Sequence, residues 1–355
     1  MKFITLPHLS GERKPPNERL VEQVDNAVLA EEFGFDGYGI GERHERPFEE
    51  SSPPVLLSNI AARTSDIRLF TTVATLSLHD PVRAYEDYAT LDHLAGGRLE
   101  LIIGKGNGTV QESLFGVPAD QVRDRHRENY ELFRRLWRED RVTWEGRFRP
   151  PLRDAEVLPR PLRPVRIWHG SATSTESVEL AARFGDPLFA SNGGRPIEPF
   201  AELIRHYRER WEFHGHDPAD ALVGAGTAGY YGARNSQDAI ERYRPVFESR
   251  LAVNNEYGHF LTFTSFEDFV ERSSALIGSP QQIIEKVHRY HEAFGHEVLH
   301  IHVDGDVLDR KEYFETLELF QSEIAPVLRR ELPSRPFPPL PGPAWPETFF
   351  SEARR

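Results

Sequence analysis

A glycine-rich, basic loop is one place in this chain where residue types and spacing point to ligand binding. The apolar run at residues 98–103 predicts a short buried strand, and glycine then alternates with one lysine and one asparagine. Glycine lets a backbone approach a ligand closely, and lysine adds a mobile positive charge. The loop therefore predicts a site for an anionic cofactor, although the same glycines would also suit a tight turn. Its residues are Gly104, Lys105, Gly106, Asn107 and Gly108.

Strand and helix patterns alternate along the whole chain around this loop. Short apolar runs predict strands, and longer segments with apolar residues at helical spacing predict helices. The predicted strands are residues 3–6, 37–40, 67–73, 98–103, 165–169, 187–190, 222–231 and 298–303. The predicted helices are residues 17–33, 51–62, 80–94, 119–140, 175–184, 196–213, 236–249, 278–294 and 311–332.

This alternation favours an α/β fold in which eight strand–helix units close into a single (β/α)8 TIM barrel, with a doubly wound open sheet as the alternative. We expect the barrel domain to cover residues 1–332, with insertions at 141–164 and 250–277, and with a hairpin at 142–148 inside the first. The proline-rich residues 333–355 predict an extended tail. Barrel enzymes carry their chemistry in the loops after the strands. Those loops are residues 42–45, 74–79, 105–107, 170–177 and 192–195.

Composition and charge exclude several classes of function. The net charge of −13 argues against nucleic acid or an anionic membrane as the main partner. No apolar run approaches the ~20 residues of a membrane span, and the N-terminus lacks the apolar segment of a secretory signal. The chain has no cysteine, which excludes disulfides, thiolate metal sites and cysteine nucleophiles. We therefore expect an acidic, cytoplasmic protein without disulfides.

The strand-end loops resemble those of the bacterial luciferase-like, flavin-dependent monooxygenases, and the resemblance runs from residue 1 to about residue 332. Each matching piece is short, and their order and spacing carry the resemblance. The pieces are Gly34-Phe35-Asp36, Glu42-Arg43-His44, Asp80-Pro81-Val82-Arg83 with Asp92, Gly97-Arg98, Gly104-Lys105-Gly106, Leu114-Phe115-Gly116, Ser174-Thr175-Glu176-Ser177 and Ala181-Ala182-Arg183-Phe184-Gly185.

The resemblance implies a barrel enzyme that uses reduced FMN and O2, through a peroxyflavin, to oxidise a small organic substrate. It also implies a homodimer and a separate flavin reductase that supplies the reduced FMN. Some branches of the family use the deazaflavin F420 for hydride transfer, which is the alternative for this chain. The sequence does not identify the substrate.

The resemblance further implies a phosphate site at Ser174 and Ser177, which stand at the start of a predicted helix. Free N–H groups and the positive end of the helix dipole favour an anion there, although Ser174 could equally cap the helix. Lys105 and Arg125 match positions where the family has cations near the phosphate. The neighbouring Arg123 competes with Arg125 for that role.

Other matches lie near the expected flavin ring. Thr72 and Val73 match the position where the family has a non-prolyl cis peptide beneath the ring. The resemblance adds Glu42, as a buried hydrogen-bond acceptor, together with Asn107 and Gly170 to the cofactor-binding set.

His44 is the sharpest catalytic candidate, because an imidazole can move a proton near neutral pH. Arg43 stands where bacterial luciferase has the first of two histidines, so Arg43 competes with His44 and would bind an anionic substrate or the flavin ring.

Two other functions stay open from the sequence. A barrel metallohydrolase would need several histidines to converge at the strand ends. A flavin-binding protein without catalysis is the other. The histidines available to a metal are His44, His79, His169, His300 and His302.

Overall fold

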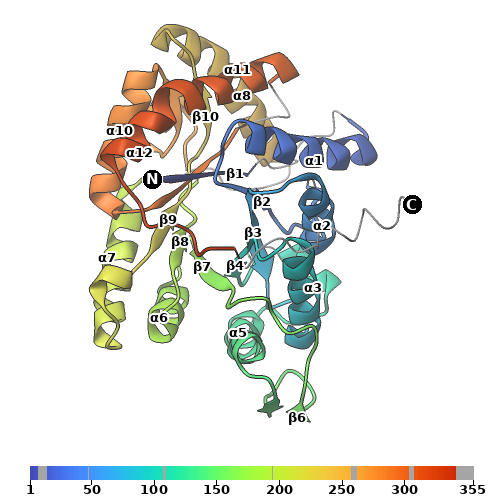
Figure 1. Cartoon of the computed structure of the whole chain (residues 1–355). Helices are drawn as coiled ribbons and strands as arrows, with labels where there is room; N and C mark the ends of the chain where they lie inside the picture. Colours follow the sequence, from blue (N-terminus) through green and yellow to red (C-terminus); the bar gives the residue numbers. More distant parts are fainter. Residues whose placement is uncertain are drawn as a thin grey trace.

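The computed structural model describes residues 1–6, 14–46, 48–106, 109–193, 195–256, 262–303 and 308–340. Within these residues, eight parallel strands close into a barrel in the order β1-β12-β9-β8-β7-β4-β3-β2, and helices surround it (Figure 1). This closure confirms the predicted (β/α)8 barrel and excludes the open sheet. The barrel strands are β1 (Lys2–Thr5), β2 (Gly37–Ile40), β3 (Arg68–Thr75), β4 (Leu99–Gly104), β7 (Arg166–Ser171), β8 (Leu188–Ala190), β9 (Val223–Ala225) and β12 (Val298–Ile301).

The helices begin and end at local signals in the sequence. Asp80 caps α3 by accepting hydrogen bonds from the N–H groups of Val82 and Arg83, at 2.9 and 3.4 Å. Gly185 ends α6 in the left-handed conformation, with φ of 69°. The helices are α1 (Pro16–Glu32), α2 (Pro53–Arg63), α3 (Pro81–Leu94), α4 (Thr109–Leu114), α5 (Val122–Arg138), α6 (Thr175–Phe184), α7 (Glu198–Phe213), α8 (Ser236–Glu256), α9 (Phe266–Arg272), α10 (Pro280–Phe294), α11 (Arg310–Leu319) and α12 (Ala325–Glu331).

The strand predicted at residues 222–231 is confirmed only in its first part, β9, and is too long, because the chain leaves the barrel after Ala225. Its second half forms β10 (Tyr230–Gly232), which pairs with β11 (Leu276–Gly278) in a separate two-stranded sheet. The hydroxyl of Tyr230 donates a hydrogen bond to the carbonyl oxygen of Thr316 in α11 at 2.9 Å, and its ring packs edge-on against Phe320. These contacts bury Tyr230 beneath the last helices instead of in the barrel wall.

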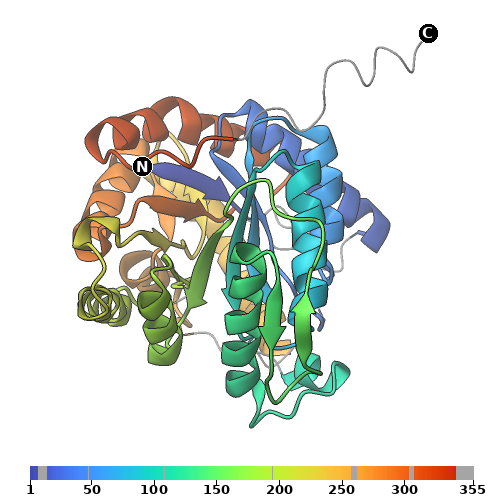
Figure 2. The same cartoon turned by 60° about the horizontal axis from the view of Figure 1, so that its bottom comes forward.

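Three other predicted segments differ markedly from the structure. The hairpin is wider than residues 142–148, because β5 (Val142–Trp144) pairs with β6 (Leu152–Ala155); it packs beside α5 (Figure 2). Helix α8 continues past residue 249 to Glu256. The helix predicted at 311–332 is interrupted by a π-helical turn at Phe320–Ile324, which separates α11 from α12.

Large apolar side chains fill the inside of the barrel, while the other face of each strand packs against the helices. Ile102 and Trp168 belong to the inner group, whereas their neighbours Leu101 and Ile167 belong to the outer core. Since side chains alternate along a strand, the next inward positions are Gly104 in β4 and Gly170 in β7. Small residues therefore line these strands at the C-terminal end of the barrel, which we call the barrel mouth. The inner group is Ile4, Phe70, Ile102, Trp168, Phe189 and Val298.

The described part of the C-terminal tail, residues 333–340, contains no helix or strand, in line with the predicted extended chain. It crosses the N-terminal end of the barrel (Figure 1). Arg335 binds Glu297, with Nε 2.7 Å from Oε1. The Phe337 ring packs onto the inner group, between the cations of Arg68 and Arg166 at 5.4 and 5.8 Å. The tail thus covers the end of the barrel opposite the mouth.

Candidate functional site

A cluster of one carboxylate and two imidazoles stands at the barrel mouth. The loop after β2 supplies Glu42 and His44, and the loop after β3 supplies His79. Oε1 of Glu42 lies 3.0 Å from Nε2 of His44 and 2.7 Å from Nε2 of His79. Oε2 accepts the backbone N–H of Thr75 at 2.8 Å. Phe115 packs edge-on against both imidazole rings, with centroids 4.7 and 5.5 Å away.

These contacts determine the charge of the cluster. Burial raises the pKa of Glu42, but the hydrogen bonds from His44, His79 and Thr75 outweigh it and lower this pKa to about 2. Burial lowers the pKa of His79, but its hydrogen bond to Glu42 and the negative charge of that carboxylate raise it overall. Glu42 is therefore an ionised acceptor at neutral pH, and protonation of His79 is favoured.

Arg43 does not join this cluster. Its Nη1 lies 3.3 Å from Oε1 of Glu45, and its guanidinium stacks 4.6 Å from the centre of the Phe48 ring. The structure thus brings His44, and not Arg43, together with Glu42. Which of the two acts in catalysis stays a prediction.

The floor of the mouth is formed in part by Thr72 and Val73, and the peptide bond between them is cis, as the resemblance implies. A Cβ atom on Gly104 would lie 2.7 Å from Cγ2 of Val73, and one on Gly170 would lie 2.8 Å from Cγ1 of Val73. Packing against Val73 therefore explains why both neighbouring strands have glycine here. The cofactor-binding role of Thr72, Val73 and Gly170 remains a prediction.

Lys105 and Arg125 approach one another through Ser77, in the loop after β3. The Ser77 hydroxyl donates to the carbonyl oxygen of Lys105 at 2.7 Å, and Nε of Arg125 lies 3.4 Å from the carbonyl oxygen of Ser77. Both cationic side chains are half-buried, whereas Arg123 is exposed. The structure therefore places Arg125, and not Arg123, next to the glycine-rich loop. Asn107 of that loop lies outside the described residues.

Ser174 caps α6, because its Oγ accepts the backbone N–H of Ser177 at 3.2 Å. The Ser171 hydroxyl donates to the carbonyl oxygen of Ser174 at 3.1 Å and fixes the approach to the helix. The cap leaves the Ser174 hydroxyl hydrogen for another acceptor, and the N–H groups at the start of any helix lack intrahelical partners. Arg127 of α5 lies 3.5 Å from Glu176 in the first turn of α6, so this ion pair links the two helices.

The histidines do not converge as a metal centre would require. His169 pairs with Asp186 at 3.4 Å, and His300 and His302 lie 3.3 and 3.2 Å from the same carbonyl oxygen, that of Leu6. Among the described residues, no group of three or more histidine, aspartate or glutamate side chains, the Glu42 cluster included, is arranged so that it could hold a metal ion.

Sequence reasoning missed the partnership of His79 with Glu42. The signals were present separately: His79 follows a predicted strand and directly precedes the helix cap Asp80. Ser77 and Phe115 were missed as well, and both depend on contacts between different loops.

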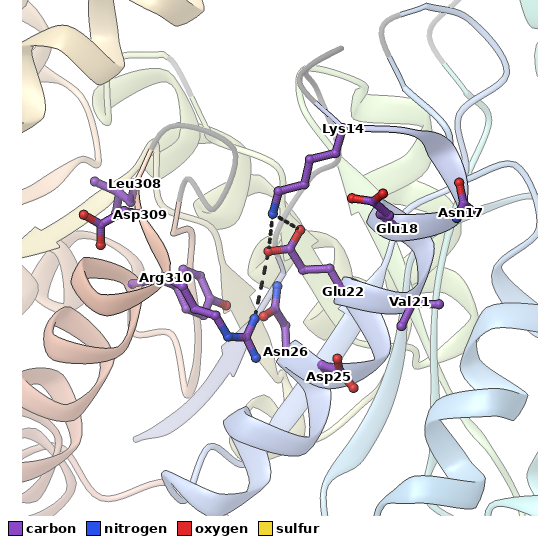
Figure 3. Close-up of a pocket in the computed structure, with 11 residues that line it drawn as sticks. Lys14, Asn17, Glu18, Val21, Glu22, Asp25, Asn26, Leu308, Asp309 and Arg310 are labelled. Carbon is purple, nitrogen blue, oxygen red and sulfur yellow. Dashed lines mark hydrogen bonds and ion pairs between the residues drawn. The ribbon is translucent and has the colours of Figure 1, made fainter.

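A cavity of about 680 Å³ lies away from these residues, between α1 and the start of α11 (Figure 3). Lys14 and Arg310 approach Glu22 from opposite sides, at 2.7 and 4.0 Å. Its lining includes none of the predicted site residues.

None of the described helices combines the length and the apolar character that a membrane span needs.

Two sequences similar to this chain belong to enzymes of different kinds. The 4-hydroxyprotoasukamycin monooxygenase of Streptomyces nodosus subsp. asukaensis is 27% identical over 345 residues, which are 91% of this chain and 90% of the relative. An F420-dependent glucose-6-phosphate dehydrogenase of Kineococcus radiotolerans is 37% identical over 201 residues, which are 54% of this chain and 58% of that enzyme. One of these two relatives is thus a monooxygenase and the other a dehydrogenase.

Solved structures share the fold. A monooxygenase from Streptomyces bottropensis superposes with a TM-score of 0.80 at 24% identity, covering 92% of this chain and 99% of the other. The oxygenating constituent of 3,6-diketocamphane monooxygenase from Pseudomonas putida, solved with FMN, gives a TM-score of 0.75 at 20% identity, covering 92% and 98%. A model of the luciferase-like monooxygenase family matches residues 1–297, and the chain belongs to that family.

Proposed function

We propose that this protein is a monooxygenase that binds reduced FMN at the barrel mouth and uses it with O2 to oxidise a small organic substrate. One observation carries the proposal: the acid–base cluster, the Thr72–Val73 floor, Lys105 and the start of α6 lie at the C-terminal ends of β2, β3, β4 and β7 or in the loops that follow them, and these four strands are consecutive in the barrel. A single elongated cofactor can therefore reach all of them from one side of the mouth.

The residues present fit a flavin phosphate at one end of this series. The Ser174 hydroxyl, the first N–H groups of α6 and the cations of Lys105 and Arg125 supply donors and positive charge for a dianion. Glu176 is the nearby acidic residue in the first turn of α6, and its pairing with Arg127 offsets its charge.

The ring system fits at the other end. Oγ1 of Thr72 is buried without a hydrogen-bond partner among the described residues, so it can donate to a ring carbonyl or accept a ring N–H. Thr72, Val73 and Gly170 are only partly buried, which leaves a surface for a flat ring to cover.

His44 is the proton-transfer residue of the proposal. Because its Nε2 faces the ionised Glu42, its Nδ1 is the atom that takes a proton from the substrate or returns it. Reduced FMN supplies the electrons that activate O2. The chain's own part is to bind and orient the cofactor, and to hold or move a proton at Nδ1 of His44.

F420 is the second candidate cofactor, and the 37% identity to an F420-dependent dehydrogenase favours it. With F420 the reaction would be a hydride transfer without O2. The longer match to a monooxygenase, over 91% of this chain, favours FMN. We further propose a homodimer that receives reduced flavin from a separate reductase.

Anaerobic titration of the purified protein with reduced FMN, and separately with F420, distinguishes the two cofactors. The proposal expects saturable binding of reduced FMN, followed by reoxidation of the bound flavin when O2 is admitted. Preferential binding of F420 would replace oxygenation by hydride transfer. Binding of neither cofactor would contradict both.

A further inference from the structure

The carboxylate of Glu42 holds two imidazoles on a single oxygen atom. Both Nε2 atoms approach Oε1, at 3.0 Å from His44 and 2.7 Å from His79. An ionised carboxylate only accepts hydrogen bonds, so each neutral ring must carry its proton on Nε2. This hydrogen-bond geometry therefore assigns the same tautomer to both rings and leaves Nδ1 of each as the atom that accepts a proton.

One negative charge thus serves two groups that can each become positive. With both rings neutral the cluster has a charge of −1, with one imidazolium it is neutral, and with two it has a charge of +1. The side chain of Glu42 is 1% exposed and that of His44 is 8% exposed, so burial favours the uncharged state. Addition of a proton to one ring therefore opposes addition to the other, and the rings titrate as a coupled pair.

The two rings are not equivalent. The side chain of His79 is 36% exposed, so it loses less hydration than His44 when it is charged. The charged groups that face His79 are Glu42 from the loop after β2 and Asp87 from α3, and Arg83 pairs with that Asp87. Next to His44 in the chain, Arg43 is paired with Glu45. These surroundings favour the positive charge on His79.

We propose that Glu42 holds a single imidazolium at the barrel mouth and that His79 carries it, which keeps His44 neutral with Nδ1 free. His79 is then a positioning residue, because it sets the protonation of His44 through Glu42 without touching the substrate. The use of Nδ1 in catalysis rests on the function proposed above, whereas the coupling itself requires no cofactor.

Long-range ¹H–¹⁵N NMR of the cofactor-free protein, labelled in histidine, tests this between about pH 5 and pH 8. In the wild type, both rings should show the Nε2–H tautomer when neutral, and His79 should become charged at a higher pH than His44. The variants His44→Gln and His79→Gln assign the resonances. Two results with the wild-type protein would overturn the proposal without any variant. One is an Nδ1–H tautomer on either neutral ring, and the other is a His44 ring that becomes charged at a higher pH than His79.

The decisive variant is His79→Gln, because the glutamine amide keeps a donor for Glu42 but cannot take up a proton. The carboxylate then serves His44 alone, so at a fixed pH of about 6 a larger fraction of His44 should be charged than in the wild type. His93→Gln is the matched control, since His93 lies at the other end of α3 and binds the carbonyl oxygen of Arg160. An unchanged or smaller charged fraction of His44 in His79→Gln would overturn the coupling. Because no flavin is present, this result is independent of whether the flavin titration succeeds.

Discussion

Nδ2 of Asn129 in α5 lies 3.0 Å from the carbonyl oxygen of His79. The same Nδ2 donates to the carbonyl oxygen of Leu76 at 2.8 Å, so one buried amide ties the loop after β3 to α5 at both ends. Helix α5 also carries Arg125, which approaches Ser77 in this loop. The helix that supplies a cation to the proposed phosphate site therefore also positions the loop that carries His79.

Replacing Asn129 by alanine should lower the free energy of unfolding by about 1–3 kcal/mol, because two carbonyl oxygens lose their donor in a buried place. Urea denaturation measures this change. Arg123→Ala is the control on the same helix, and as an exposed substitution it should stay within about 0.5 kcal/mol of the wild type. Equal stability of the two variants would contradict the importance of this link.

Replacing Gly104 by alanine should also destabilise the protein, by about 1–3 kcal/mol, because the new Cβ would lie 2.7 Å from Cγ2 of Val73. Val73 is β-branched and has little rotamer freedom with which to yield. Gly193→Ala is the matched control, since the nearest atom to its Cβ would be 3.5 Å away. Thermal denaturation of both variants checks the difference, and an unaffected Gly104→Ala would show that the floor of the mouth can give way.

Replacing Phe337 by alanine should destabilise the barrel by about 1–3 kcal/mol, because the ring covers apolar side chains at the end opposite the mouth. Since this end is remote from the proposed cofactor site, affinity for reduced FMN should not change. Pro339→Ala, at an exposed position of the same tail, serves as the control. A loss of flavin affinity in the folded Phe337→Ala variant would contradict the separation of the two ends.

Glu42 gives the stability a specific dependence on acid. Its pKa is lowered from 4.5 to about 2 in the folded protein. The resulting stabilisation is present above pH 4.5 and is lost as the pH falls from there through the folded pKa; it amounts to roughly 3 kcal/mol. Urea denaturation at several pH values should therefore show a shallower loss of stability below pH 4.5 in Glu42→Gln than in the wild type. Parallel curves would contradict an ionised, doubly bonded Glu42.

Local signals explain which parts of the fold a sequence can predict. The bounds of β2 and α6 match the prediction, because apolar spacing, the Ser174 cap and Gly185 are all encoded within a few residues. The second half of the strand predicted at 222–231 is wrong, since Tyr230 is buried by contacts with Thr316 and Phe320, about 90 positions later in the chain. A segment buried in the barrel wall and one buried beneath the last helices have the same apolar pattern, so the sequence does not distinguish them.

In the site, too, local features could be predicted, whereas contacts between different loops could not. Glu42, His44, Lys105 and Ser174 could be proposed from their places after predicted strands, and the family resemblance located the cis peptide at Thr72–Val73. The pairing of Glu42 with His79 could not, because it joins residues 37 positions apart, in two loops that the pairing of β2 with β3 brings side by side. The choice of Arg125 over Arg123 likewise needed the orientation of α5.

The proposed function depends most on one contact, the binding of the flavin phosphate between Lys105 and the first turn of α6. Its most direct test is the anaerobic affinity for reduced FMN of the wild type, of a Lys105→Ala/Ser174→Ala double variant, and of Arg123→Ala as the control for loss of one positive charge. Two charge-assisted contacts are removed in the double variant, so its affinity should fall at least about 10-fold, while Arg123→Ala should bind like the wild type. Wild-type affinity in a folded double variant would contradict the account.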